Sequence, residues 1–336
     1  MIIDIFTHFL PARYFRELTE IAPPFARLRK LAPIHDLDVR LKTMDGVGDY
    51  RQVLSLPNTP LEAITTPAVG AKLARVANDE MADLVERHRD RFPAFVAALP
   101  MHDMEAAMAE LHRAIRDLGA RGVQVYTNVA GRPLDDPAFE PIFAAMAEYD
   151  LPIWLHPTRT AAVPDYPTES RSRFELWWAF GWPYETSVAM ARFVFTGIFA
   201  RYPEIKIITH HCGGMIPYFE GRVRRTLQLL QTGTFLGGGD GGDADAGGPR
   251  LDPSSKLPDL ADFKKFYNDT ALFGALAGTK CGIEFFGVEN VTFATDAPFG
   301  GIREIADSIL ELGLSDKDVK QIYCGNAERL MKMSLS

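Results

Sequence analysis

The sequence predicts a closed barrel of eight parallel strands, each followed by a helix: a (β/α)8 or TIM barrel. Short β-branched runs alternate with longer stretches in which apolar residues recur every three or four positions. This alternation repeats about eight times, as expected when crossover helices join parallel strands. The 336 residues hold the ~250 residues of such a barrel and leave room for insertions.

The predicted strands are short runs rich in Val, Ile and Phe. In chain order they are Ile2–Phe6, Gln52–Leu56, Ala94–Leu99, Gly122–Tyr126, Ile153–His156, Lys206–His210, Phe266–Asp269 and Val291–Thr295. Predicted helices between them include Ala71–Arg91, Met104–Leu118, Pro137–Tyr149, Thr186–Arg201 and Ile302–Glu311. An open doubly wound sheet is the competing fold. A glycine-rich turn after the first strand would favour it, and the segment THFLPARYF at that point contains no glycine.

Two insertions interrupt the repeat within a single predicted domain, residues 1–336. Residues Leu10 to Leu41 contain several prolines and little strand character, so we expect loops and short helices over one barrel end. Residues Gln231 to Leu257 are rich in glycine and aspartate and predict a flexible surface insertion. Its aspartates do not match the spacing of a calcium-binding loop, which also needs a closing glutamate.

Charge and composition exclude several classes of partner. The formal net charge of −8 argues against nucleic acid and anionic membrane surfaces, which attract clustered Lys and Arg. No apolar run approaches the ~20 residues of a membrane span, and the first residues do not resemble a signal peptide. The three cysteines are widely spaced and form no paired motif. We therefore expect a globular cytoplasmic protein with reduced thiols.

Polar residues concentrate where the predicted strands end, the end at which barrel enzymes carry their catalytic groups. Five of the eight histidines fall there: His8, His102, His156, His210 and His211. A single histidine at such a place is more often structural than a ligand. The joint placement of His8, His156, His211 and Asp296 at the ends of strands one, five, six and eight instead predicts one shared site.

Phe6 stands at a position where a metal site would carry a second ligand next to His8. Alternate residues of a strand face the same side, so Phe6 and His8 are both expected to face the barrel interior. A phenyl ring cannot bind a metal. Catalytic zinc needs only three protein ligands and a water, however, and His8, His156 and Asp296 supply that number. We therefore expect a metal site with lowered affinity and an additional open position.

Several motifs together resemble a known family. They are IDIFTHFLP at the start, VRLKTMD at Val39–Asp45, LPIWLHP at Leu151–Pro157, WWAFGWPYETS at Trp177–Ser187, GIFARYPEIKIITHHCGGMIPYFEGR at Gly197–Arg222, FYNDTAL at Phe266–Leu272 and VTFATDAPFG at Val291–Gly300. The chain resembles the amidohydrolase-2 group of the amidohydrolase superfamily over nearly its whole length. Within that group it is most similar to aminocarboxymuconate-semialdehyde decarboxylases and resorcylate decarboxylases.

The resemblance implies a (β/α)8 barrel, usually a homodimer, with one divalent metal ion, commonly zinc or manganese. His8 matches the second histidine of the family's His-x-His motif, whose first position is Phe6 here. His156 and Asp296 match the ligands of the fifth and eighth strands. His211 matches the histidine that assists catalysis or contacts the metal.

The resemblance also implies residues that bind a small carboxylate substrate. Lys42 lies where related decarboxylases often carry an arginine for a substrate carboxylate, and Trp178 matches a tryptophan of the site wall. Together with its neighbours Trp177 and Trp182, and with Phe299, it could form a flat apolar surface for a planar substrate. Phe6 would border the same space.

The implied activity is non-oxidative decarboxylation of a small aromatic or unsaturated acid. Asp296 is the predicted proton donor to the carbon that bears the carboxylate, and His211 would shuttle the proton or activate a water. The same ligands could instead generate a metal-bound hydroxide for hydrolysis or hydration of a lactone, an amide or an unsaturated acid. A third alternative, motivated by Phe6, is a non-catalytic barrel that binds a small acid.

Overall fold

The computed structural model describes residues 1–232 and 258–335. The predicted insertion at Gln231–Leu257 therefore lies outside the described residues, apart from the first two, which end helix α10 (Glu220–Thr232).

The strands of the barrel agree closely with those predicted. They are β1 (Ile2–His8), β2 (Tyr50–Ser55), β3 (Ala94–Phe95) with β4 (Ala97–Ala98), β5 (Val123–Tyr126), β8 (Ile153–His156), β9 (Ile207–Thr209), β10 (Tyr267–Asp269) and β11 (Val291–Thr292). β3 and β4 form one barrel strand, because only Val96 separates them and its N–H donates to the Leu54 carbonyl of β2. All neighbouring pairs in the orders β1-β2-β3 and β11-β10-β9-β8-β5-β4 are parallel.

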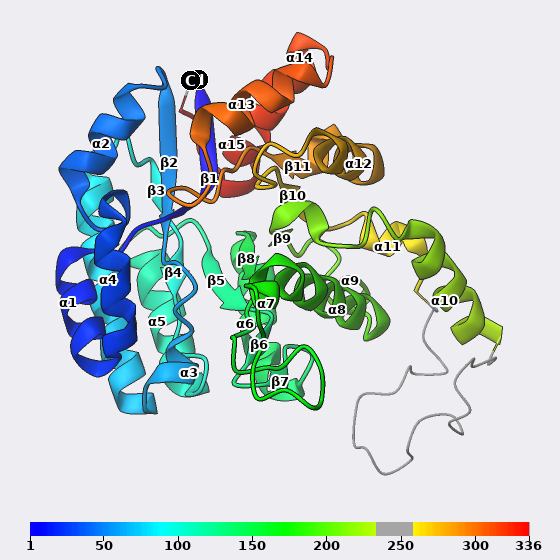
Figure 1. Ribbon diagram of the computed structural model, residues 1–336, viewed down its shortest axis with the longest axis horizontal. Helices are drawn as coiled ribbons and strands as arrows, with labels where there is room; N and C mark the ends of the chain where they lie inside the picture. Colours follow the sequence, from blue (N-terminus) through cyan, green and yellow to red (C-terminus); the bar gives the residue numbers. More distant parts are fainter. Residues whose placement is uncertain (233–257, 336) are drawn as a thin grey trace.

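Backbone hydrogen bonds between the first and last strands complete the ring. The Ile5 N–H donates to the Phe293 carbonyl at 3.1 Å, and the His8 N–H donates to the Ala297 carbonyl at 2.7 Å. The strands therefore form the closed barrel that the sequence predicts, with helices around its outside (Figure 1).

The principal outer helices follow the expected alternation. They are α4 (Pro67–Arg87), α5 (Met104–Arg116), α6 (Glu140–Tyr149), α8 (Gly181–Phe195), α10, α12 (Leu276–Phe286) and α13 (Ile302–Glu311). Shorter helices are α3 (Leu61–Ile64), α7 (Leu176–Ala179), α9 (Ile198–Arg201), α11 (Leu260–Phe263), α14 (Asp316–Lys320) and α15 (Asn326–Met331). None of the helices in the described ranges is long and apolar enough to cross a membrane.

The insertion after β1 is largely helical. It contains α1 (Ala12–Ile21), two 3-10 segments (Pro23–Lys30 and Ala32–Ile34) and α2 (Leu37–Asp45), which confirms the predicted short helices. α1 packs against α4, so this part of the insertion lies on the outside of the barrel, whereas the sequence predicted it over one barrel end (Figure 1). A small antiparallel hairpin, β6 (Asn128–Val129) with β7 (Arg132–Pro133), follows β5 and was not expected from the sequence.

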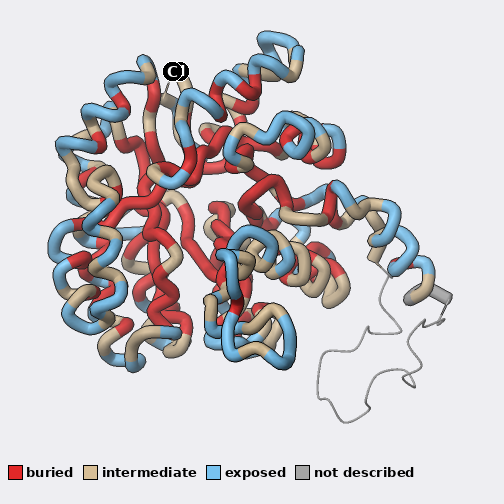
Figure 2. The backbone as a smooth tube through the Cα atoms, viewed as in Figure 1, coloured by how far each residue is buried: buried red, intermediate tan, exposed pale blue. Residues whose placement is uncertain are grey.

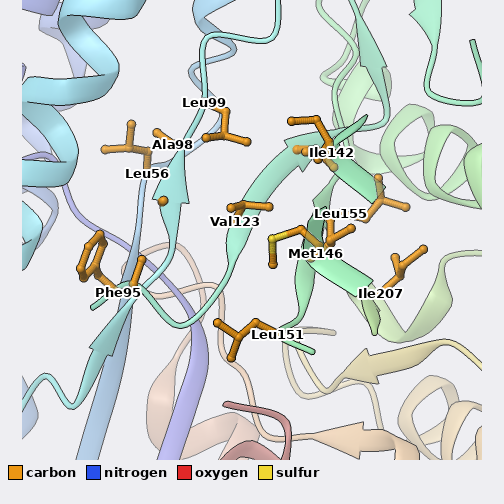
Figure 3. Close-up of a cluster of buried hydrophobic side chains, with 14 of the residues drawn as sticks. Leu56, Phe95, Ala98, Leu99, Val123, Ile142, Met146, Leu151, Leu155 and Ile207 are labelled. Carbon is orange, nitrogen blue, oxygen red and sulfur yellow. The ribbon is translucent and has the colours of Figure 1, made fainter. Parts of the chain in front are cut away.

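Two buried clusters hold the barrel together, and Figure 2 shows how burial concentrates in and around the strands. The larger cluster lies between strands and helices, where Val123 and Leu155 of the sheet meet Ile142 and Met146 of α6 (Figure 3). The smaller cluster fills the barrel interior. Its members include Ile3, Ile5, Phe6, Val53, Trp154, Ile208 and Ala294.

The interior cluster extends toward the amino ends of the strands, where the chain termini also lie. Leu330 and Met331 of α15 join the cluster, and the carbonyl of Leu335 accepts a hydrogen bond from Arg51 near the start of β2. Both chain termini therefore lie at the amino ends of the strands (Figure 1). Apolar residues thus fill much of the barrel from that side, and catalytic groups of such barrels stand at the carboxyl ends of the strands.

Candidate functional site

Four imidazole rings surround Phe6 at the carboxyl ends of the strands. The Phe6 ring centroid lies 4.5 Å from that of His8, 5.4 Å from His156, 3.4 Å from His210 and 6.0 Å from His211. Phe6 itself is completely buried. The sequence predicts that Phe6 borders the site. In the structure, its phenyl ring lies at the centre of the histidine cluster.

An irregularity in β1 brings Phe6 to this place. The pairing of β1 with β2 shifts between Asp4 and Thr7, so strict alternation is lost. As a consequence the consecutive residues Ile5 and Phe6 both belong to the interior cluster. Such a bulge reorients side chains beside active sites in many sheets.

The other site residues reach the cluster from four further strand ends. His156 ends β8, His210 and His211 follow β9, Asp269 ends β10, and Asp296 follows β11. Because the strands are parallel, all these ends lie at the same side of the barrel. The predicted residues His8, His156, His211 and Asp296 are therefore brought together.

The backbone at His211 and Asp296 adopts a conformation that side chains rarely take. Their φ angles are 55° and 61°, in the left-handed region, and Cys212 has a φ of 54°. Neighbours hold both residues: the His211 N–H donates to Asp269 Oδ1 at 2.9 Å, and the Asp296 N–H donates to the Phe6 carbonyl at 3.0 Å. Strain of this kind costs about 1–3 kcal/mol per residue and concentrates at functional sites.

Asp296 lies between two imidazoles. His8 Nε2 is 3.0 Å from Asp296 Oδ1, and His211 Nε2 is 3.9 Å from Asp296 Oδ2. Burial alone would raise the pKa of Asp296, but the neighbouring imidazoles of His211 and His8 hold it below its ordinary range. Burial likewise disfavours the charged form of His211, yet the interaction with Asp296 raises the pKa of this imidazole. The arrangement therefore favours the ionised form of Asp296 and the protonated form of His211.

His156 has the properties of a neutral ligand. Its Nδ1 lies 2.6 Å from the Pro157 carbonyl, so Nδ1 carries the hydrogen and Nε2 presents its lone pair. Burial, followed by the neighbouring His8 and His210, holds the pKa of His156 well below the ordinary value. A histidine with Nδ1 bound to a carbonyl and Nε2 free is the usual form of a metal ligand.

His210 and Asp269 form a second pair that sequence reasoning did not assign a role. His210 Nδ1 and Asp269 Oδ2 are 2.5 Å apart, and both side chains are fully buried. Asp269 Oδ1 also accepts the backbone N–H groups of His211 and Ala271, at 2.9 and 3.0 Å. Burial lowers the pKa of His210 despite this carboxylate. The only sequence signal for the pair is that both residues stand at strand ends.

The aromatic wall differs in detail from the one predicted. Trp182 lies nearest the cluster, with ring centroids 5.7 Å from His156 and 6.5 Å from His211. Trp178 is 39% exposed and lies 6.5 Å from Trp182, one ring farther out. Phe299 is half-exposed, with its ring 6.0 Å from that of His8.

The predicted carboxylate-binding residue Lys42 is exposed on α2, while Arg40 of the same helix is buried. Arg40 Nη1 donates to the His8 carbonyl at 2.5 Å and its Nε donates to Gln52 at 2.7 Å, so Arg40 supports the end of β1. His102, left open by the sequence, is 3.4 Å from the Thr65 hydroxyl.

A cavity of about 570 Å³ is lined by residues that follow β5 and β8 and by residues of α8, and not by the histidine cluster. Its lining includes Asn128, Thr158, Arg159 and Glu185. Arg159 Nη1 is 3.3 Å from Glu185 Oε1, and the Trp182 indole donates to the Arg159 carbonyl at 3.2 Å. Arg159 thus lines the cavity and contacts Trp182 of the aromatic wall through its backbone carbonyl.

The side chains at the site are of the chemical types that bind divalent ions. Within residues 1–232 and 258–335, no group of three or more His, Cys, Asp or Glu side chains is already arranged around one point, and Phe6 lies among the candidates. His8 Nε2 is engaged with Asp296. The neutral imidazole of His156 and the ionised Asp296 are nevertheless the donor types of three-ligand catalytic sites. A bound cation would replace the His8–Asp296 hydrogen bond.

The fold and the site together define a barrel enzyme whose acid–base groups come from the carboxyl ends of several strands. Comparison with protein families identifies it further: the chain belongs to the Amidohydrolase family, whose model matches residues 3–332.

Known relatives extend this assignment. The chain is 30% identical over 323 residues to a gamma-resorcylate decarboxylase of Polaromonas sp., covering 91% of this chain and 89% of the relative. It is 32% identical over 188 residues to a 2-amino-3-carboxymuconate-6-semialdehyde decarboxylase of Dictyostelium discoideum, covering 56% of this chain and 51% of that one. The family and the decarboxylase class predicted from the sequence are thereby confirmed.

A solved structure shows the same fold. A dihydroxybenzoic acid decarboxylase from Polaromonas sp., with bound manganese and the inhibitor 2-nitroresorcinol, superposes with a TM-score of 0.78 and 26% identity. The match covers 98% of this chain and 96% of the other.

Proposed function

We propose that this protein is a metal-dependent, non-oxidative decarboxylase of a small hydroxylated aromatic acid. The observation that carries the proposal is Asp296, held between His8 and His211 at the mouth of a barrel whose relatives are decarboxylases. An ionised carboxylate flanked by two imidazoles can accept and deliver a proton at a fixed place.

His8, His156 and Asp296 would hold one divalent ion. Manganese is favoured over zinc by the related structure that contains it. The ion would act as a Lewis acid and as a template that orients the substrate oxygens.

The residues of this chain would handle the proton. Decarboxylation requires protonation of the ring carbon that bears the carboxylate, after which the C–C bond breaks, its electrons return to the ring and CO₂ leaves. A proton held by His211 can pass to Asp296, 3.9 Å away, and from there to the ring carbon.

The aromatic wall and the cavity would position the substrate. Trp182 and Phe299 offer flat apolar faces on two sides of the cluster. Arg159 lines the cavity and is placed better than the exposed Lys42 to attract a carboxylate. Trp178 would contribute at the outer edge of this surface.

A homodimer and a cytoplasmic location complete the proposal. Phe174, Phe180 and Tyr184 are 88%, 72% and 53% exposed on the segment around α7, a concentration of aromatic surface that a second copy could cover. The three cysteines are free thiols, as expected in a reducing compartment.

The proposal is tested by incubating the purified protein with a panel of hydroxybenzoates and with matched lactones. We expect CO₂ release from at least one hydroxybenzoate, no ring opening of the lactones, and divalent metal in elemental analysis of the protein. Lactone opening without CO₂ release would reject decarboxylation in favour of hydrolysis.

A further inference from the structure

The stacked ring of His210 presents a nitrogen that nothing in the proposed mechanism uses. Its Nδ1 lies 2.5 Å from a carboxylate oxygen of Asp269, so Nδ1 carries the hydrogen and Nε2 presents a lone pair. His210 is completely buried, and in the described part of the chain Nε2 has no hydrogen-bond partner. A buried acceptor without a partner is unfavourable, so Nε2 is available to accept a ligand.

Asp269 orients this ring in the way that carboxylates orient the metal-bound histidines they contact in other proteins. Such a histidine typically donates its other ring N–H to a carboxylate, which fixes the tautomer and raises the basicity of the ligating nitrogen. Asp269 is itself held by two backbone N–H groups, at 2.9 and 3.0 Å. The ring of His210 is therefore fixed before any ligand binds.

The ring also points toward the proposed metal site. Ile208, two residues earlier, belongs to the interior cluster, and alternate residues of a strand face the same side, so His210 faces the barrel interior. Its centroid lies 5.8 Å from that of His156.

Phe6 supports the ring without covering the nitrogen. The two rings are nearly parallel, with an interplanar angle of 14° and centroids 3.4 Å apart. Stacking covers one face of the imidazole, whereas the lone pair of Nε2 lies in the ring plane. The phenyl group thus excludes a ligand at position 6 and at the same time packs on a histidine that can supply one.

We propose that His210 Nε2 is an additional donor to the divalent ion held by His8, His156 and Asp296, in place of the ligand that Phe6 cannot provide. This inference rests on the metal-dependent function proposed above and changes its ligand set. The strand that supplies the fourth donor would be β9 instead of β1. Phe6 and the cation would share the space between the histidines, so metal binding requires the phenyl ring to shift.

The test compares His210→Asn and His210→Gln with the wild-type protein. The Asn amide can still donate to Asp269 from the place of Nδ1 but has no atom at Nε2, whereas Gln reaches the Nε2 position. His88→Asn is the matched control, because His88 lies just after α4 and before β3, at the amino ends of the strands. His8→Ala removes a proposed metal ligand and therefore tests whether the metal binds at the proposed site.

Metal affinity is measured by chelator competition with Mn²⁺, and the ligand field by the absorption spectrum of the Co²⁺-loaded proteins. We expect His210→Asn to lower Mn²⁺ affinity at least ~tenfold and to change the Co²⁺ spectrum, with a smaller loss for His210→Gln. His88→Asn should match the wild type. The melting temperatures of the metal-free proteins are measured beside them, and partial recovery of Mn²⁺ affinity in His210→Gln separates ligation from a purely structural role.

Wild-type affinity and an unchanged Co²⁺ spectrum in His210→Asn would overturn the inference. If His8→Ala then still lost the metal, the proposed function would stand with three ligands only. A wild-type protein that binds neither Mn²⁺ nor Co²⁺ would overturn this inference and the metal dependence together, while CO₂ release by that metal-free protein would preserve the reaction class.

Discussion

Two pairs, each of a carboxylate and a histidine, lie around the Phe6 ring, and they differ in their exposure at the mouth of the barrel. His210 and Asp269 are both 0% exposed, and Asp269 is fully occupied by His210 and two backbone N–H groups. The side chains of His211 and Asp296 remain 10% and 8% exposed at the mouth of the barrel. The same chemical groups thus form a fixed support in one place and an accessible proton-transfer group in the other.

The pKa shifts of the two histidines express this difference. Burial dominates at His210 and lowers its pKa, whereas the interaction with Asp296 overcomes burial at His211 and raises it. Adjacent residues of one turn therefore favour opposite protonation states. The left-handed backbone at His211 makes this possible, because it turns the two consecutive side chains toward different strands.

Of the substitutions at these two pairs, Asp296→Asn should have the largest effect on turnover. In Asp296→Asn the proton acceptor and a proposed metal ligand are lost, so kcat should fall by roughly 10³-fold or more. Steady-state kinetics measure the loss, and circular dichroism should show an unchanged fold. Residual activity within a few-fold of the wild type would remove Asp296 from the mechanism.

Asp269→Asn should act on stability first. The amide cannot satisfy His210 and both backbone donors as the carboxylate does, and we expect unfolding to become easier by about 3 kcal/mol. Urea titration measures this change, with Asp296→Asn as the matched control at the other carboxylate. Equal destabilisation by the two variants would contradict the division into a supporting and a reactive carboxylate.

His211→Asn should lower kcat by about 10²-fold with little change in KM, because it removes a proton-transfer group and not a binding contact. The kinetic measurement needs the wild-type protein and the His88→Asn variant beside it. A change confined to KM would mean that His211 binds substrate and does not transfer the proton.

A third buried carboxylate, Asp4, has no histidine partner. Its ionisation should make the free energy of unfolding depend on pH. Burial raises its pKa to about 7, although Thr295, Tyr50 and the Phe6 N–H donate to it. A raised folded-state pKa adds stability at low pH that is lost as pH rises through that value. Between pH 5 and 7 this single group should lower the free energy of unfolding by about 2 kcal/mol.

The measurement is urea unfolding of wild type and Asp4→Asn at both pH values. The variant should lack this component of the pH dependence even if its overall stability is lower. An identical slope in the two proteins would show that Asp4 is ionised throughout the range.

Sequence periodicity predicted the barrel well because each strand and helix carries its own pattern. The helix Ile302–Glu311 and the strand Ile153–His156 coincide with their predicted bounds. The convergence of His8, His156, His211 and Asp296 followed from the barrel itself, since parallel strands place their carboxyl ends together.

Features that depend on the direction in which a side chain points could not be predicted from the sequence. Lys42 and Arg40 are two residues apart on α2, so about 200° of helical rotation separates them and only Arg40 turns inward. The pairing of His210 with Asp269 joins residues 59 positions apart, across β9 and β10. No local pattern encodes such a contact, and the bulge that centres Phe6 in the cluster is equally invisible.

The central claim is that this site protonates a ring carbon and releases CO₂. The most direct measurement is turnover of a hydroxybenzoate in D₂O, with CO₂ quantified and the product examined by mass spectrometry and NMR. The account predicts one CO₂ per product and one deuterium at the carbon that carried the carboxylate, both abolished in Asp296→Asn. Substrate consumption without CO₂ release, or a product with no deuterium at that carbon, would contradict it.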